Sequence, residues 1–304
     1  MSAIRGMLVC RRMPAPAEVT ALIKDAAHRI RHSPKTGTLS MFDARADAVE
    51  LLDLATDGTG SDRVPTKEER KKFKALLKRR LDGEPMALII GYVDFMGLRF
   101  NVRPGVFAPR QSSTITSMLA ISRLRRRATP VAIDVATGAG PIAIAVARAV
   151  PKARVYGTDI AADAIKQSRE NARANGIRNV HFRRSDVLSG LPRELKGNVD
   201  VITSHPPYVP VDEVVDLPVE VSAFEPEHTL TDQSDDGLGI VRQLARESAE
   251  WLRPGGWLLI ELSPDRARPA AAALRRHLSS VRTLGERGDV TRVVSGRRSR
   301  SSAR

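Results

Sequence analysis

The segment His205-Pro206-Pro207-Tyr208 follows an apolar run, Val199 to Thr203, and combines residues suited to holding a flat group that carries nitrogen. The prolines lack backbone N–H groups and stiffen the chain, which leaves carbonyl oxygens available as acceptors. The ring of Tyr208 can pack on the face of an amide or a base. An NH2 group that donates both protons to such acceptors keeps its lone pair directed at an electrophile. All four residues are therefore predicted to be catalytic.

A glycine-rich turn lies upstream, between a predicted strand at Val131 to Val135 and a helical pattern that starts at Pro141. Glycines let the backbone approach a ligand closely, and proline suits the first position of a helix. Ala143 satisfies only the loose form of the dinucleotide-binding fingerprint, so the turn by itself does not specify a ligand.

Three acidic residues near strand ends distinguish between the possible ligands. Asp134 lies just before the turn, where a carboxylate suits an amino-bearing ligand and would repel a pyrophosphate. Asp159 closes the next strand and is placed to accept hydrogen bonds from ribose hydroxyls. Asp186 follows the strand after that and is predicted to meet an adenine, although a solvated loop position is an equally good interpretation. Together they favour S-adenosyl-L-methionine, whose predicted contacts are Asp134, Thr137, Gly138, Ala139, Gly140, Asp159, Asp186 and His205.

Further segments make the chain similar to the HemK-like release-factor glutamine N5-methyltransferases over residues 65–264. They are Gly83 to Pro85, Gly91-Tyr92, Phe95 to Val102, Phe107 to Arg110, Ser185-Asp186, Glu225-Pro226, Asp236 to Leu238 and Gly255 to Glu261. The resemblance implies a class I methyltransferase with a Rossmann-like sheet and a small N-terminal helical domain that engages a protein substrate. It also implies methyl transfer to a side-chain amide, such as the glutamine N5 of a peptide chain release factor.

The chain departs from this family where the substrate is recognised. The family has Asn-Pro-Pro-Tyr where this chain has His205. A neutral imidazole offers one acceptor and one donor, whereas an amide offers a carbonyl with two lone pairs and a separate NH2 group, so His205 can replace only part of the recognition. Two acidic residues after Arg110 are replaced within Gln111 to Thr114, and a common tryptophan is Val187. The departures predict an altered acceptor, or a glutamine that is held less well. A methyltransferase for a small metabolite or a nucleic-acid amine, and an inactive cofactor-binding module, remain as alternatives.

The pattern of elements predicts an α/β fold in which a parallel sheet carries helices on both faces and binds ligands at the carboxyl ends of its strands. The predicted strands are Val131 to Val135, Arg154 to Thr158, Val180 to Arg184, Val199 to Thr203 and Gly256 to Leu262, followed by an antiparallel pair, Val281 to Glu286 and Thr291 to Val294, around a turn at Arg287 to Asp289. The predicted helices are Ile142 to Val150, Ala161 to Asn175, Ile240 to Leu252 and Arg266 to Leu278.

Four regions are predicted along the chain. Residues 1–82 form a helical substrate-recognition domain with helices at Pro16 to Arg31, at Ser40 or Asp43 to Leu54, and at Thr66 to Leu81. Residues 83–112 form a linker with a β-hairpin from about Tyr92 to Val102. Residues 113–296 form the methyltransferase domain, and residues 297–304 a basic disordered tail.

Composition limits the possible partners and surroundings. The net charge of +14, from 49 basic and 35 acidic residues, would attract an acidic protein or a phosphate backbone, so RNA stays a possible partner beside a release factor and a small molecule. The single cysteine, Cys10, fits a reducing compartment, and no apolar run reaches the ~18 residues of a membrane span. We therefore expect a soluble cytoplasmic protein without a membrane partner. His28 and His32 lack further ligands nearby, and methyl transfer requires no metal, so none is predicted.

Overall fold

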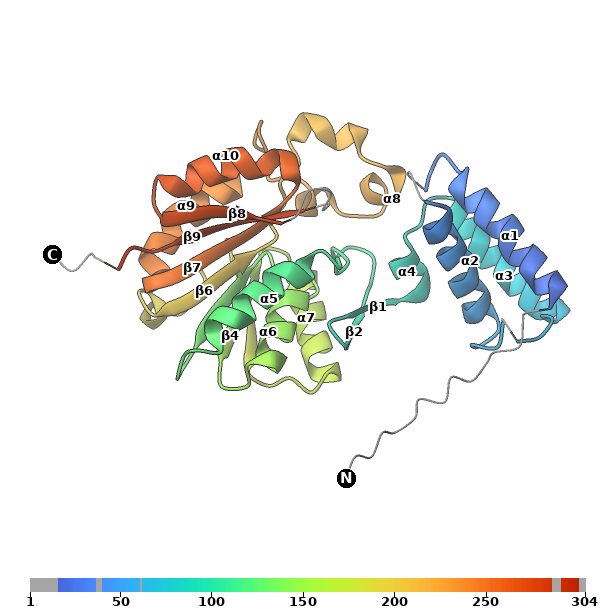
Figure 1. The fold of residues 1–304 in the computed structure, drawn as a ribbon, viewed down its shortest axis with the longest axis horizontal. Coiled ribbons are helices and arrows are strands. Elements are labelled where there is room, and N and C mark those ends of the chain that lie inside the picture. The colour runs from blue at the N-terminus through green and yellow to red at the C-terminus, as the bar shows by residue number, and fades with distance from the viewer. Residues whose placement is uncertain (1–15, 37–39, 61, 286–290, 301–304) are drawn as a thin grey trace, which may run out of the picture. The chain divides into compact units, whose positions relative to one another are not determined.

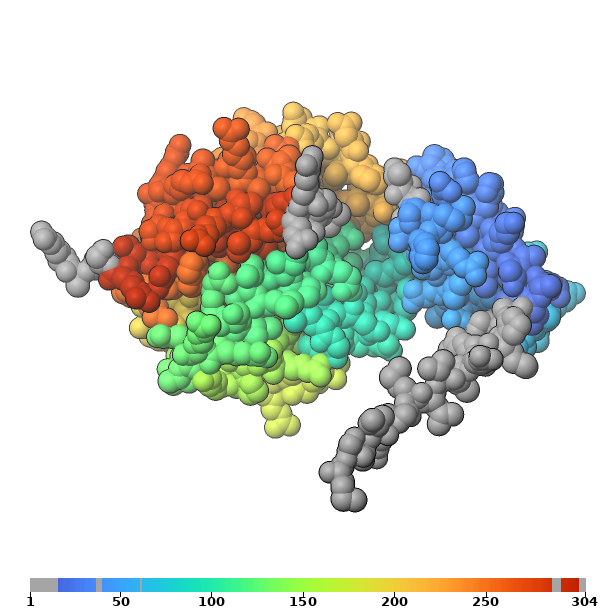
Figure 2. All heavy atoms as spheres, in the orientation of Figure 1, coloured from blue at the N-terminus to red at the C-terminus, as the bar shows by residue number. Residues whose placement is uncertain are grey.

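The computed structural model describes residues 16–36, 40–60, 62–285 and 291–300, which form two compact units (Figure 1). The smaller unit contains the chain up to Ile90 together with Pro218–Glu220, and the larger unit contains Gly91–Leu217 and the chain from Val221 onward. No helix among the described residues combines the length and the apolar character that a membrane crossing needs. Figure 2 gives the same view with all heavy atoms, and side chains fill the space between the ribbons of the larger unit.

The smaller unit is helical, as predicted. Its helices are α1 (Ala17–Arg31), α2 (Met41–Ala55), α3 (Lys67–Leu81) and the short α4 (Met86–Ile90). The side chain of Ser40 caps α2 by accepting a hydrogen bond from the backbone of Asp43, and Thr66 and Glu69 form a reciprocal capping box at α3. The apolar faces meet in a core that includes Val19, Ile30, Leu51, Leu52 and Phe73.

The larger unit contains the predicted mainly parallel sheet. Its seven strands have the order β5-β4-β3-β6-β7-β9-β8, in which β9 is antiparallel to both of its neighbours. The strands are β3 (Val131–Val135), β4 (Arg154–Asp159), β5 (Val180–Arg184), β6 (Val199–Ser204), β7 (Leu252–Leu262), β8 (Ser279–Leu284) and β9 (Arg292–Arg297). Strand β3 pairs with β4 on one side and β6 on the other, so the strand order reverses at β3, and the carboxyl end of β3 lies at this topological switch point. Ligands bind at such a point in open α/β sheets.

Helices cover both faces of this sheet, as predicted. Helices α5 (Ser113–Leu124), α6 (Pro141–Ala149) and α7 (Ala162–Ala174) supply apolar side chains to one core cluster, which includes Ala120, Ile144, Ile165, Phe182 and Val201. Helices α9 (Gly239–Trp251) and α10 (Pro264–Arg275) supply the other, which includes Ile133, Ile202, Val241, Leu258 and Leu274. Sequence periodicity predicted all of these helices except α5.

A short antiparallel hairpin, β1 (Tyr92–Phe95) and β2 (Leu98–Asn101), precedes the sheet and confirms the predicted hairpin. Its second strand is attached to α7 by side-chain amides. Asn171 accepts a hydrogen bond from the backbone N–H of Asn101 at 2.9 Å, and Asn175 donates one to the carbonyl of Arg99 at 2.7 Å. These contacts fix the hairpin to the larger unit.

Two predictions differ from the structure. The stretch between the predicted strand at Val199 to Thr203 and the predicted helix at Ile240 to Leu252 carries no predicted helix, but it contains η2 (Val211–Asp216), α8 (Val219–Ser222) and η3 (Glu227–Thr229). The tail expected from residue 297 starts too early, because Arg297 belongs to β9 and the backbone N–H of Arg298 donates to Gly256 at 2.9 Å. The expected turn at 287–289 and the end of the tail at 301–304 lie outside the described residues.

Candidate active site

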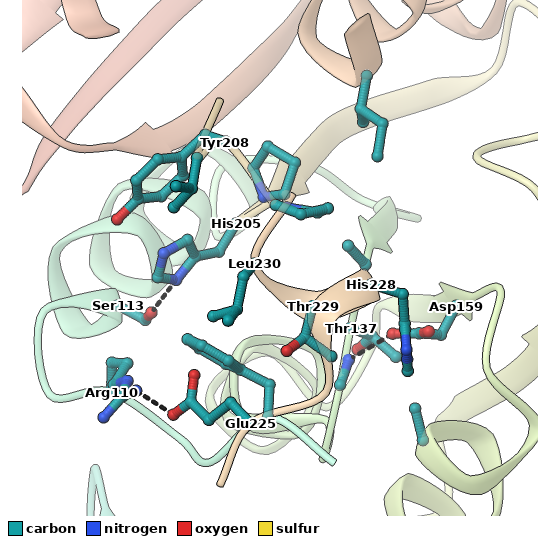
Figure 3. A pocket seen from close by; sticks show the side chains of 18 of the residues that line it. Arg110, Ser113, Thr137, Asp159, His205, Tyr208, Glu225, His228, Thr229 and Leu230 are labelled. Atoms are coloured by element: carbon teal, nitrogen blue, oxygen red, sulfur yellow. Dashed lines mark hydrogen bonds and ion pairs between the residues drawn. The ribbon is translucent and has the colours of Figure 1, made fainter. Parts of the chain in front are cut away.

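A cavity of about 920 Å³ opens at the carboxyl ends of β3, β4, β5 and β6 and is bounded on the far side by residues of the 209–230 segment. It is the cavity shown in Figure 3, and we refer to it below as the cofactor pocket. Its walls include the predicted residues Asp134, Thr137, Gly138, Ala139, Asp159, Asp186, His205, Pro206, Pro207 and Tyr208. The fold thus brings together side chains from four strand ends that are far apart in the sequence.

Gly140 is the one predicted residue that does not line the pocket. It caps the N-terminus of α6 with a φ of 88°, and a Cβ there would lie 3.0 Å from Ile144 and 3.1 Å from Ser168. Its positive φ and its close packing both require glycine. Gly140 therefore shapes the turn without lining the cavity.

Asp159 connects the glycine turn to the end of β4. One carboxylate oxygen accepts a hydrogen bond from the backbone N–H of Gly138 at 2.9 Å, and the other accepts one from the backbone N–H of Ala161 at 3.0 Å. Burial raises the pKa of this carboxyl, and the two backbone N–H groups act in the opposite direction. Each carboxylate oxygen has a second lone pair, so the group can still accept hydrogen bonds from two ligand hydroxyls.

Asp134 supports the turn from below. It is buried, and its two oxygens accept hydrogen bonds from the hydroxyls of Thr137 and Thr203, both at 2.7 Å. Burial raises the pKa of Asp134 to about 6, because the ionised form loses its hydration. The observed hydrogen bonds make Asp134 an organiser of the turn, although it also lines the pocket.

Replacing Asp134 by asparagine should remove a pH dependence of stability. Burial favours the protonated carboxyl, so this residue stabilises the native state most below its unfolded pKa of about 4 and loses that contribution as the pH rises through about 6. The difference between the two pKa values corresponds to about 3 kcal/mol. Urea unfolding at pH 4 and pH 7 should show the native protein losing about that much more free energy of unfolding than Asp134→Asn. Equal losses in the two proteins would contradict this interpretation.

His205 lies at the end of β6 among aromatic rings. Its ring stacks on Tyr208 with a centroid distance of 5.8 Å and an interplanar angle of 10°, and it meets Phe107 edge to face at 5.6 Å. Nδ1 is 3.4 Å from Oγ of Ser113 and 3.8 Å from a carboxylate oxygen of Glu261 (the Ser113 contact is drawn in Figure 3). Burial lowers the pKa of His205, although the Glu261 carboxylate opposes this shift and Arg110 adds to it. The neutral imidazole is therefore favoured.

An ion pair and a close backbone contact hold the loop that faces His205. Arg110 pairs with Glu225, which joins the end of the hairpin linker to the segment after α8. Gly237 packs directly on the chain after Tyr208, since a Cβ at Gly237 would lie 2.1 Å from the Tyr208 carbonyl oxygen. The short distance explains why the Asp236 to Leu238 segment carries a glycine at that position.

Sequence reasoning missed two residues of this site. Ser113 belongs to α5, the helix that periodicity did not detect, and Glu261 lies within β7, where an acid in an apolar strand was noted only as part of a family motif. A fully buried acid in a central strand is itself a signal, because such a charge needs a partner. Asp186 and Val187 both line the pocket, and Val187 also packs into the core with a φ of 46°.

Comparisons with known proteins identify the family of this chain. Residues 97–219 match the model for the methyltransferase small domain, and residues 47–91 match the PrmC N-terminal domain. The release factor glutamine methyltransferase of Rhodopirellula baltica is 37% identical over 213 residues, which are 68% of this chain and 70% of that protein. The chain belongs to the release factor glutamine methyltransferase family. It is therefore an S-adenosyl-L-methionine-dependent enzyme with a class I methyltransferase fold.

One further relative and one solved structure are similar to this chain. A 4-amino-L-phenylalanine/4-methylamino-L-phenylalanine methyltransferase of Streptomyces pristinaespiralis is 38% identical over 195 residues, which are 62% of this chain and 65% of that enzyme. The structure of a Thermus thermophilus 16S rRNA methyltransferase, solved with AdoMet and guanosine, aligns with a TM-score of 0.50 and 19% identity over 68% of this chain and 49% of the other. The second likeness establishes the fold alone.

The residues of the pocket fit S-adenosyl-L-methionine. A carboxylate with free lone pairs, Asp159, stands at the end of β4, and the backbone of Gly138 lines the wall beside it. The ligand is cationic at sulfur, and the pocket contains the acidic side chains of Asp134, Asp159 and Asp186. This charge distribution favours a sulfonium and disfavours a pyrophosphate.

Proposed function

We propose that this enzyme methylates the side-chain amide nitrogen of a glutamine in a peptide chain release factor. The observation that carries the proposal is the His205 to Tyr208 loop at the end of β6, which faces the same cavity as the turn and Asp159. Membership of the release factor glutamine methyltransferase family supports the acceptor, and the helical unit that matches the PrmC N-terminal domain would engage the protein substrate in the cytoplasm.

The cofactor would lie along the strand ends. Asp159 would accept hydrogen bonds from the two ribose hydroxyls, Thr137 to Ala139 would line the methionine part, and Asp186 would face the adenine. The bound cofactor supplies an electrophilic methyl group on sulfur. The remaining task of the protein is to present a nitrogen lone pair to that methyl group.

The acceptor amide would lie against the loop after β6. The ring of Tyr208, stacked parallel to His205, offers a flat apolar surface, and the carbonyl oxygens of the Pro-Pro pair can accept the N–H bonds of the amide. His205 would accept one N–H through its free ring nitrogen. Because its other nitrogen faces Ser113 and Glu261, it has no donor left for the amide oxygen.

A labelling experiment with three acceptors tests the proposal. Purified enzyme and methyl-labelled S-adenosyl-L-methionine would be incubated separately with a release factor, with 4-amino-L-phenylalanine and with RNA. We expect label in the release factor, at a glutamine located by mass spectrometry, and none after every glutamine of the labelled peptide is replaced by alanine. Label in the amino acid or in RNA, with none in the release factor, would overturn the proposal in favour of those acceptors.

A further inference from the structure

Glu261 is a buried acid with half of its hydrogen-bonding capacity unused. It lies in β7 next to β6 and has no exposed surface. The hydroxyl of Thr116 donates to Oε2 at 3.1 Å. Within the described part of the chain, Oε1 has no hydrogen-bond partner, and Nδ1 of His205 lies 3.8 Å from it.

The energetics of burial favour a contact between these two groups. A carboxylate that is removed from water loses several kcal/mol unless it is paired and hydrogen-bonded. Because N–H···O bonds measure about 2.7–3.2 Å, Nδ1 and Oε1 need to approach by less than about 1 Å. Ser113, at 3.4 Å from the same nitrogen, directs Nδ1 toward this side of the ring. Nε2 is then the ring nitrogen that remains for a ligand in the pocket.

We propose that Glu261 and His205 form a proton-accepting pair, in which Glu261 positions the imidazole and His205 takes up the proton that the acceptor nitrogen releases during methyl transfer. The inference rests on the proposed function for its acceptor and gives that reaction a base. In the loop after β6, the backbone carbonyls of the Pro206-Pro207 pair can hold an N–H but cannot remove its proton, and the imidazole of His205 is the basic group of that loop.

Methyl transfer leaves one proton to be removed from the acceptor nitrogen. The amide nitrogen forms a bond to the methyl carbon, and the bond between that carbon and sulfur breaks with its electron pair left on sulfur. A methylated amide that keeps both hydrogens is a strongly acidic cation, so one proton passes to Nε2 of His205. The resulting imidazolium is stabilised by the Glu261 carboxylate and returns its proton to water when the product leaves.

Several charged groups act on the imidazole besides Glu261. The guanidinium of Arg110 opposes protonation of the His205 imidazole. The phenol of Tyr208, which stacks on the imidazole, stays neutral because burial raises its pKa. Asp265 and Glu225 also raise the pKa of Tyr208. Of these groups, Glu261 is the one that raises the pKa of His205.

Replacement of Glu261 by glutamine gives the primary test, because the amide keeps the size of the side chain and an oxygen for Thr116. We expect kcat for release-factor methylation to fall at least tenfold at pH 8, with KM changed by less than about threefold. Without the carboxylate the pKa of His205 falls, so the acid limb of the kcat profile should move to lower pH. An acid limb at the native position with native kcat would overturn the pair.

A double-mutant cycle separates positioning from a merely structural role. In the His205→Asn background, Glu261→Gln should leave kcat unchanged, since the acid acts only through the imidazole. Thr116→Val, which removes the other hydrogen bond to Glu261, serves as the control and should keep the native pH profile. The same loss of kcat from Glu261→Gln in both backgrounds would show that Glu261 merely supports the fold.

A measurement without turnover keeps this inference independent of the acceptor. In ¹⁵N-detected NMR of the histidine rings, with His205 assigned from the His205→Asn spectrum, native protein at pH 8 should show a proton on Nδ1 and none on Nε2. Glu261→Gln should lower the midpoint of the His205 titration. If a release factor is not methylated but these signals are as expected, the proposed acceptor fails and the pair stands. If the proton resides on Nε2, the pair fails whatever the acceptor.

Discussion

At an acidic pH below the pKa of His205, the His205→Asn enzyme should methylate a release-factor glutamine at least tenfold faster than the native enzyme. Protonation turns the imidazole into a donor only, so it can neither accept an N–H from the amide nor remove a proton. Asparagine does not titrate and offers both an acceptor oxygen and an NH2 donor to the amide. Leaving one buried polar group of the substrate unpaired costs about 1–3 kcal/mol, and about 1.4 kcal/mol is a factor of ten in rate.

The pH dependence distinguishes this explanation from a general gain of activity. Burial lowers the pKa of His205 from its ordinary value of about 6.5, so the native imidazole is neutral at pH 8 and becomes charged only well below neutrality. The advantage of the variant should therefore shrink at least tenfold from the acidic end of the profile to pH 8. Initial rates at subsaturating release factor, taken from pH 8 down to the lowest pH at which thermal unfolding shows both proteins folded, would measure it. A ratio of rates that is independent of pH would contradict the titration of His205.

Replacing Asp159 by alanine should weaken the binding of S-adenosyl-L-methionine at least tenfold. Two charge-assisted hydrogen bonds to ribose, each worth about 1.5–3 kcal/mol, would be lost. Isothermal titration calorimetry gives the affinity directly. Because Asp159 also accepts hydrogen bonds from Gly138 and Ala161, some of the effect would come from loosening of the turn.

A matched variant separates these two contributions. Asp159→Asn keeps the size of the side chain and one acceptor oxygen, and should lose less affinity than alanine. A cofactor analogue that lacks one ribose hydroxyl should bind the native enzyme more weakly than S-adenosyl-L-methionine does. Asp159→Ala has no carboxylate to accept from that hydroxyl, so it should bind the analogue no more weakly than it binds S-adenosyl-L-methionine. Unchanged cofactor affinity in Asp159→Ala would remove Asp159 from the ribose site.

Residue patterns predicted the sheet and the strand ends well because each buried parallel strand is a short apolar run in the sequence and is bounded by turn residues. Val131 to Val135 is apolar except for Asp134, and the glycines that follow this strand have positive φ angles that form a turn. The same argument placed Asp159 and His205 at the edge where they lie. The family resemblance then supplied the order of the motifs and the cofactor.

Other features depend on contacts between distant segments and leave no local signal. Helix α5 escaped detection because four of its six buried positions are small or polar, namely Ser113, Thr116, Ser117 and Ala120. The pairing of Arg110 with Glu225 and the approach of Glu261 to His205 join residues that are far apart in the chain. Arg297 was placed in a tail because arginine-rich ends are commonly disordered, whereas the pairing of β9 with β7 extends to that residue.

The ion pairs of Arg80 bear on how this protein can be dissected. Arg80 is buried in the helical unit and forms ion pairs with Asp47 at 2.8 Å and with Glu220 at 2.9 Å. Glu220 belongs to the three-residue stretch Pro218–Glu220. The residues on either side of this stretch, Leu217 and Val221, line the cofactor pocket. A fragment that ends at Ile90 would lack this carboxylate and leave one side of a buried guanidinium unmatched, at a cost on the order of 3–5 kcal/mol. The helical unit is thus discontinuous in sequence, and a chimera that exchanges it between relatives must carry residues 218–220 along with the N-terminal helices.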